Sequence, residues 1–288
     1  MTPPTIVLIH GGWHTPALYE KLTSHLKSLG HEVHVPRLPS MNGARPPNAD
    51  LFTDTALIRG YVESLADAGR DIVVLMHSYG GQVGTHALLG LGAETRRRAQ
   101  LQQQKQQRQW RGGGGGGVVR LVYVAAFALG EGESMIGMVK EMGDEALILL
   151  AFDFAEDGTV LDRDPGGLLV GPGLEEEELE GYVGRFERWN GTGMYQGLEG
   201  CAWREIPVSY VCTKNDMTVP FGYQQVMIGK LRGEGKEVET FELATGHCPQ
   251  LTMPKELGEI VHGIVCKEEE SSRNHADSTL DEAFNTTE

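Results

Sequence analysis

The sequence lacks closely spaced cysteines, long apolar runs and a targeting segment. None of the four cysteines among its 288 residues has the short paired spacing of a zinc site or a redox motif: Cys201, Cys212, Cys248 and Cys266. No apolar run approaches the roughly 20 residues that a bilayer-spanning helix needs. The N-terminus has neither the charged nor the apolar region of a signal peptide. We therefore expect reduced thiols and a cytoplasmic protein that does not enter a membrane.

Positive charge is also in deficit. The chain carries 40 acidic and 25 basic residues, for a net charge of −15. That balance disfavours nucleic acid and anionic membrane surfaces as partners. No glycine-rich phosphate loop with lysine is present, and no cluster of His, Asp and Glu has the spacing of metal ligands. We expect no cofactor and no metal, a small molecule as the partner, and an oligomeric state that leaves a homodimer open.

What the sequence does contain is an alternation of strands and helices. Apolar or alternating runs predict strands at residues 5–10, 31–36, 71–76, 118–127, 206–212 and 238–243. Amphipathic stretches predict helices at residues 16–29, 53–68, 82–93, 221–232 and 255–266. Strands that alternate with helices imply an α/β fold with a mostly parallel sheet and helices on both of its faces.

Three segments depart from this alternation. Residues 94–117 form a low-complexity insertion, rich in Arg, Gln and Gly, which we expect to extend the preceding helix and then become a poorly ordered loop. Residues 130–205, after the fourth predicted strand, are expected to form a cap over the carboxyl edge of the sheet. Residues 267–288 are polar and acidic, and we expect a disordered tail. The core is then residues 1–129 and 206–266.

The third predicted strand leads directly into Ser78, followed by Tyr79 and two glycines. Strand, serine, glycines and helix together indicate a nucleophile elbow, in which a strained turn holds the serine hydroxyl above the sheet edge. The usual pattern is Gly-x-Ser-x-Gly, but Met76 occupies its first position. That departure predicts slightly looser packing at the turn.

The partners that such a serine needs follow later strands. In a parallel sheet, reactive groups collect on loops at the carboxyl ends of the strands. His247 follows the last predicted strand and can serve as the base, while Asp216 follows the strand before it and can orient the imidazole. Glu131 or Glu133 is an alternative acid. The amides of Gly12 and Tyr79 are candidate oxyanion donors.

These motifs resemble the α/β-hydrolase superfamily over roughly residues 4–266, and in particular its branch of plant methylesterases and hydroxynitrile lyases. The matching pieces are residues 8–13, 77–81, 124–127, 211–213 and 246–247, with Asp216 and Pro220. The resemblance implies the chain order nucleophile, acid, base. The lyases carry a lysine after the triad acid and a threonine after the first-loop histidine, where this chain has Met217 and Gly11. Both departures favour hydrolysis.

Neighbouring residues receive simpler interpretations. His10 is expected to bind backbone groups and shape the oxyanion loop, and His77 to pack with its ring turned away from Ser78. Trp13 and His14 are candidate substrate-pocket residues. The favoured function is a serine hydrolase that cleaves a carboxylic ester of a small apolar molecule through an acyl-enzyme. The alternatives are a carbon–carbon bond hydrolase or lyase of the β-diketone or retro-Claisen type, and a non-catalytic ligand receptor.

Overall fold

The computed structural model describes residues 3–107 and 115–285. Its centre is a six-stranded sheet in the order β2-β1-β3-β4-β8-β9, with every neighbouring pair parallel. The strands are β1 (Thr5–Ile9), β2 (Val33–His34), β3 (Asp71–His77), β4 (Gly117–Val124), β8 (Val208–Thr213) and β9 (Val238–Leu243). The predicted parallel α/β sheet is confirmed, and the central strands are apolar along their length because helices cover both faces.

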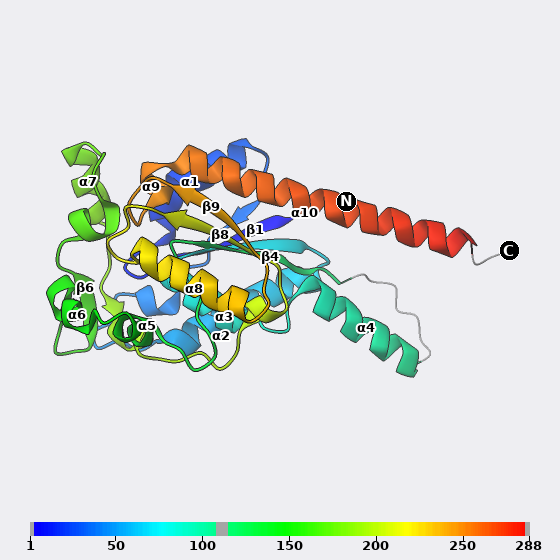
Figure 1. The fold of residues 1–288 in the computed structure, drawn as a ribbon, viewed down its shortest axis with the longest axis horizontal. Coiled ribbons are helices and arrows are strands. Elements are labelled where there is room, and N and C mark those ends of the chain that lie inside the picture. The colour runs from blue at the N-terminus through cyan, green and yellow to red at the C-terminus, as the bar shows by residue number, and fades with distance from the viewer. Residues whose placement is uncertain (1–2, 108–114, 286–288) are drawn as a thin grey trace.

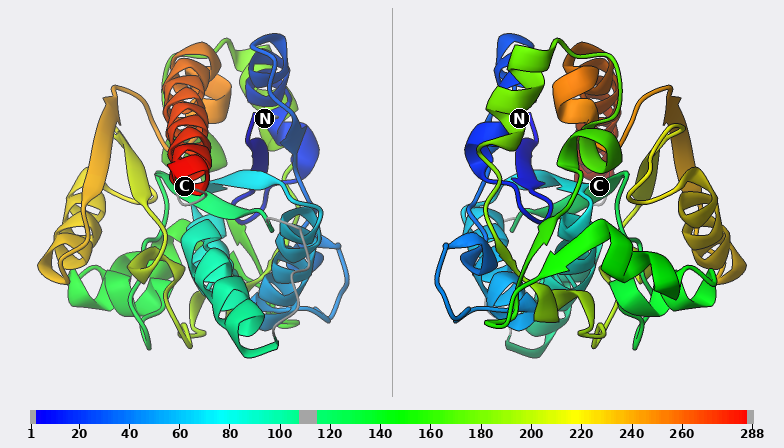
Figure 2. Two further views of the ribbon diagram at one scale, coloured as in Figure 1. Left: turned by 90° about the vertical axis from the view of Figure 1, so that its right-hand side faces the viewer. Right: turned by 90° about the vertical axis from the view of Figure 1, so that its left-hand side faces the viewer.

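Helices cover the two faces of this sheet (Figure 2). On one face, α1 (Glu20–Ser28) packs beside α10 (Pro254–Asn285). On the other face lie α2 (Leu51–Asp67), α3 (Tyr79–Ala87) and α8 (Phe221–Gly233). The start of α2 is set by Asp50, whose carboxylate accepts a hydrogen bond from the Thr53 amide and caps the first turn. Among the described residues, no helix has both the length and the apolarity that crossing a membrane requires.

The helix after Ser78 is shorter than predicted. It ends at Ala87, and Gly90, with a φ of +82°, separates it from a new helix, α4 (Ala93–Gln107). The chain reverses at Gly90 because a residue without a Cβ adopts this left-handed conformation at little cost. The low-complexity insertion is therefore helical up to Gln107, and its glycine-rich part at residues 108–114 lies outside the described residues.

Residues 130–205, which we call the inserted segment, connect β4 to β8 and extend beyond the main sheet at one end (Figure 1). A three-stranded antiparallel sheet in the order β5-β6-β7 forms its centre. Its elements are α5 (Met135–Glu141), α6 (Glu145–Ala151), β5 (Phe152–Phe154), β6 (Thr159–Asp162), α7 (Glu176–Val183) and β7 (Trp189–Asn190), with short turns at Gly166–Val170, Gly191–Met194 and Ala202–Arg204.

The last helix is longer than the sequence predicts. A disordered tail was expected from residue 267, but α10 continues to Asn285 and projects away from the sheet (Figure 1). Two ion pairs tie the first turn of this extension to the sheet: Glu268 binds Arg120 on β4, and Lys267 binds Glu239 on β9. Polar composition suggested disorder, whereas Lys267 and Glu268 find partners that are distant in sequence and hold the start of the extension against the sheet.

Candidate active site

Ser78 occupies a strained turn between β3 and α3. Its backbone has φ 54° and ψ −123°, a conformation that a non-glycine residue rarely adopts. The two following glycines make the turn sterically feasible: a Cβ on Gly80 would lie 2.3 Å from the Ile9 carbonyl oxygen, and one on Gly81 would lie 2.8 Å from that of Phe127. This is the geometry expected of a nucleophile elbow, in which the strain holds the hydroxyl away from the backbone.

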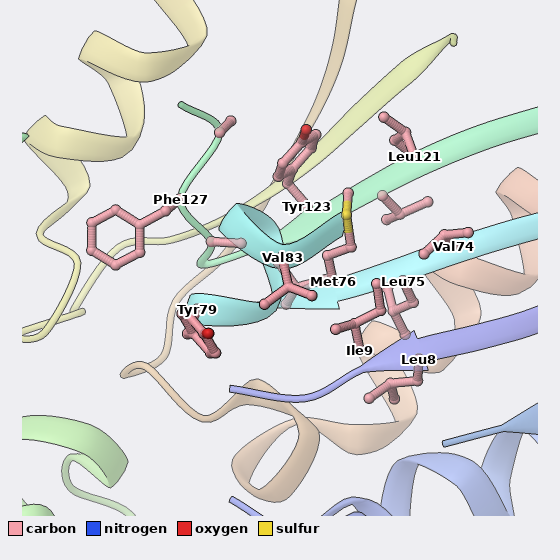
Figure 3. Packing of buried hydrophobic residues seen from close by; sticks show 14 of the residues in the cluster. Leu8, Ile9, Val74, Leu75, Met76, Tyr79, Val83, Leu121, Tyr123 and Phe127 are labelled. Atoms are coloured by element: carbon pink, nitrogen blue, oxygen red, sulfur yellow. The ribbon is translucent and has the colours of Figure 1, made fainter. Parts of the chain in front are cut away.

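Met76 does not loosen the turn as predicted. Its side chain is completely buried and lies against α3 at Gly84, where an added Cβ would be only 2.3 Å from the Met76 sulfur. Figure 3 shows this sulfur within the packed core between strand and helix. In the usual pattern, a glycine at the position of Met76 lets the strand and the helix approach. Here Gly84 on α3 provides that space instead, and the Met76 side chain fills it.

His247 and Asp216 come together on neighbouring loops at the carboxyl edge of the sheet. The Nδ1 atom of His247 lies 2.8 Å from Oδ2 of Asp216, and both side chains are buried. Asp216 also accepts hydrogen bonds from the amides of Thr218 and Val219 and from the Thr213 hydroxyl, at 2.8–2.9 Å. These donors hold the carboxylate in a fixed orientation toward the His247 ring.

The alternative acids lie elsewhere. Glu133 binds Lys230 and the Gly130 amide, and Glu131 binds Arg204. Each carboxylate is therefore already engaged by a cation, and neither contacts the His247 imidazole. Of the acids that the sequence offered, only Asp216 reaches that ring.

The second nitrogen of His247 is available for chemistry. Because Nδ1 faces Asp216, Nε2 is the free atom, and it is buried without a hydrogen-bond partner among the described residues. Within the same part of the chain, the Ser78 hydroxyl also makes no hydrogen bond. The Nε2–H of His77, the residue before Ser78, donates to the His247 carbonyl oxygen at 2.8 Å. This contact brings the two loops together.

The loop that follows β1 approaches Ser78 closely because it carries two glycines. A Cβ on Gly11 would lie 3.0 Å from the Ser78 Cβ, and one on Gly12 would lie 2.9 Å from the ring of Trp189. The Tyr79 amide is the first in α3 and so lacks an intrahelical acceptor. Gly12 and Tyr79 line the same cavity as Ser78, which suits both amides to stabilise a developing negative charge.

Buried histidines brace this loop. The Gly11 amide donates to the Tyr19 hydroxyl, which in turn donates to Nδ1 of His77 at 2.7 Å. This leaves the His77 Nε2–H to donate to the His247 carbonyl oxygen. The Nε2 atom of His10 accepts a hydrogen bond from the Leu38 amide, and its Nδ1 contacts the Gly11 carbonyl oxygen. Both contacts are expected of a residue that shapes the loop.

Burial keeps these histidines neutral. Desolvation lowers the pKa of His10 to about 4 and that of His14 to about 3, and it holds the pKa of His77 well below its usual range. Near neutral pH, none of these three imidazoles carries a positive charge. His14 packs against Phe186 and Cys248 and does not line the cavity beside Ser78, contrary to the prediction that it is a pocket residue.

The cavity beside Ser78 is small, about 40 Å³, and almost wholly apolar. It includes the predicted pocket residue Trp13, whose indole donates to the Val160 carbonyl oxygen. The sequence missed most of the other lining residues, because they belong to the inserted segment and have no motif: Met135, Ile136, Val139, Ile148, Phe152, Trp189 and Met194. Phe127 and Thr218 complete the lining.

Comparisons with known proteins agree with this architecture. The model of the alpha/beta hydrolase family matches residues 6–260. Among curated proteins, the chain is 28% identical over 263 residues to Probable hydrolase R7 from a Phoma species, covering 91% of this chain and 98% of that protein. It is also 28% identical over 256 residues to alpha/beta hydrolase nvfD from Aspergillus novofumigatus, covering 88% and 93%.

Among solved structures, an extracellular alpha/beta-hydrolase from a Paenibacillus species superposes with a TM-score of 0.68 at 21% identity, covering 90% of this chain and 98% of that one. A pyrethroid hydrolase from Sphingobium faniae superposes with a TM-score of 0.65 at 19% identity, covering 93% and 100%. At these identities, the two structures establish the shared fold.

Proposed function

Because the chain belongs to the alpha/beta hydrolase family, we propose that it is a serine hydrolase that cleaves a carboxylic ester of a small apolar molecule. The observation that carries the proposal is the buried His247–Asp216 hydrogen bond, which leaves the imidazole Nε2 without a partner beside the strained Ser78 turn. A serine hydroxyl needs a neighbouring base to become nucleophilic at neutral pH, and an imidazole oriented by a carboxylate is such a base.

The proposed reaction runs through an acyl-enzyme. Ser78 Oγ attacks the ester carbonyl carbon while its proton moves to His247 Nε2, and Asp216 stabilises the resulting imidazolium. The carbonyl oxygen becomes an oxyanion that accepts hydrogen bonds from the Gly12 and Tyr79 amides. When the carbon–oxygen bond breaks, the alcohol leaves with the proton held on His247. A water molecule then transfers a proton to His247 and attacks the acyl carbon. When the bond from that carbon to Ser78 Oγ breaks, Oγ takes the proton back from His247 and the acid leaves.

The apolar lining of the cavity supports an apolar acyl or alcohol group. We further propose that residues 130–205 act as a cap, because this segment supplies most of the side chains around Ser78. The cavity volume of about 40 Å³ leaves little room for a substrate, so side chains of the cap must move when one binds. Cytoplasmic location and a homodimer stay predictions.

Covalent labelling tests the proposal directly. A fluorophosphonate probe should label the wild-type protein and leave Ser78→Ala unlabelled. Short-chain nitrophenyl esters should be hydrolysed, with kcat falling by about a thousandfold or more in His247→Ala. Thr192→Ala, on an outer turn of the inserted segment, is the control and should be labelled like the wild type.

The outcomes separate the alternatives. A folded wild-type protein that resists the probe contradicts the hydrolase proposal, and if such a protein still binds small esters, the receptor hypothesis is favoured. Labelling of Ser78 without turnover of any ester, combined with cleavage of a β-diketone, would assign the same residues to carbon–carbon bond hydrolysis.

A further inference from the structure

A second cavity adjoins the one beside Ser78. Its volume is about 90 Å³, and it lies between the inserted segment and the loop that follows β8. Four residues line both cavities and form the wall between them: Val139, Ile148, Phe152 and Thr218. A ligand held at Ser78 therefore meets the second cavity once these side chains shift.

The second cavity contains two carboxylates, and only one of them is satisfied. Asp144 accepts a hydrogen bond from the Tyr223 hydroxyl at 2.6 Å. Asp162, the last residue of β6, is 92% buried, since its exposed fraction is 8%. Its Oδ1 accepts from the Asp164 amide at 2.8 Å, but its Oδ2 is buried without a partner among the described residues.

An unpaired carboxylate oxygen in an apolar wall is energetically unfavourable, because water no longer solvates it and no donor replaces that water. Burial accordingly raises the pKa of Asp162 to about 6, while the positive form of His247 acts in the opposite direction. Asp216 already occupies His247 Nδ1, so Asp162 is free for another role.

We propose that Asp162 is a substrate-binding residue that accepts a hydrogen bond from a hydroxyl group on the substrate, at the end remote from the scissile ester. This inference rests on the proposed function, which identifies the group that reacts at Ser78 as an ester. It narrows the substrate class to apolar esters with an alcohol or phenol group, because a hydroxyl supplies the donor that Oδ2 lacks and adds no charge to an apolar cavity. Within the lining of both cavities, Asp162 is the residue with an unsatisfied acceptor.

The test uses two ketones that resemble an ester, para-hydroxybenzylacetone and its methyl ether, in which a methyl group replaces the hydroxyl proton. Their dissociation constants are measured by NMR titration for the wild type, Asp162→Asn and Asp144→Asn. The wild type should bind the hydroxyl compound about 10–100-fold more tightly, the range for a hydrogen bond to a charged group. Asp162→Asn, which replaces the charged acceptor with a neutral one, should lower this ratio to a few-fold or less. Asp144→Asn, which alters an acceptor already in use, should keep the wild-type ratio.

Equal affinity of the wild type for both ketones overturns the proposal, whether or not the variants fold. An unchanged preference in folded Asp162→Asn also overturns it. Because binding is measured without turnover, the result is independent of the fluorophosphonate experiment. If the wild type prefers the hydroxyl compound but Ser78 is not labelled, the hydrolase function is contradicted and the hydroxyl site is supported. If Ser78 is labelled but the wild type shows no preference, the hydrolase function is supported and the hydroxyl site is contradicted.

Discussion

The contact between Met76 and Gly84 predicts a strong energetic coupling between strand β3 and helix α3. Met76 is completely buried, so Met76→Ala removes a core side chain and should lower the free energy of unfolding by about 2–5 kcal/mol. Gly84→Ala alone places a Cβ 2.3 Å from the Met76 sulfur. Overpacking of this kind costs about 1–3 kcal/mol, partly offset by a gain of about 1 kcal/mol in helix propensity.

The two substitutions should compensate each other. In the Met76→Ala background the sulfur is gone, so Gly84→Ala meets no obstruction from it, fills part of the vacated volume and keeps its helix propensity. The double variant should therefore be more stable than Met76→Ala alone, with a coupling of about 1–3 kcal/mol between the sites. The residual contact of the added Cβ with Ile9, at 3.0 Å, limits the gain.

Urea unfolding followed by circular dichroism, on the wild type and the three variants, measures this coupling. Gly229→Ala is the control, since a Cβ there meets no atom within 4 Å and should have the same effect in both backgrounds. If Gly84→Ala changes the free energy of unfolding equally in both backgrounds, within about 0.5 kcal/mol, the explanation of Met76 is wrong.

Three further predictions concern the pH dependence of stability, the loop that carries His247, and the last helix. The pKa of His14 in the folded protein, about 3, lies below the usual 6.5, so the folded protein binds fewer protons than the unfolded chain between these pH values. The free energy of unfolding should therefore fall as pH drops from about 6.5 toward 3. In thermal melts, His14→Phe should lose less stability over this pH range than the wild type. Gly246→Ala places a Cβ 2.4 Å from the Val170 carbonyl oxygen and should displace the loop that carries His247. The kcat for nitrophenyl esters should then fall at least tenfold, while tryptophan fluorescence shows an intact fold. Full activity would contradict the placement of that loop. Glu268→Gln should lower the free energy of unfolding by about 1–2 kcal/mol in urea titrations, because it leaves a largely buried arginine without its anion, and the exposed-pair change Lys267→Gln should cost less.

Local patterns accounted for much of the fold. The central strands were predictable because parallel strands covered on both faces are apolar runs, and the edge strands because their apolar and polar residues alternate. The positions of Ser78, Asp216 and His247 follow from the rule that loops at the carboxyl edge carry reactive groups. The strain at Ser78 was also predictable, since two glycines after a serine permit a turn that other residues would block. The short β2, only Val33–His34, was harder to define because an edge strand has a partner on one side alone.

Other features depended on contacts between distant residues, for which sequence spacing carries no signal. The continuation of α10 beyond residue 266 is such a case, because its ion-pair partners lie on β4 and β9. The packing of Met76 is another, because it depends on a missing Cβ on the next helix.

The amino-acid sequence by itself determined the α/β framework and the residues at its carboxyl edge, because both follow from short-range periodicity and turn chemistry. Only the tertiary structure decided what surrounds Ser78. The apolar wall, the exclusion of His14 from the cavity and the unpaired oxygen of Asp162 all result from how the inserted segment packs over the sheet. Packing of this kind depends on the fit of many side chains at once, and no single motif encodes it.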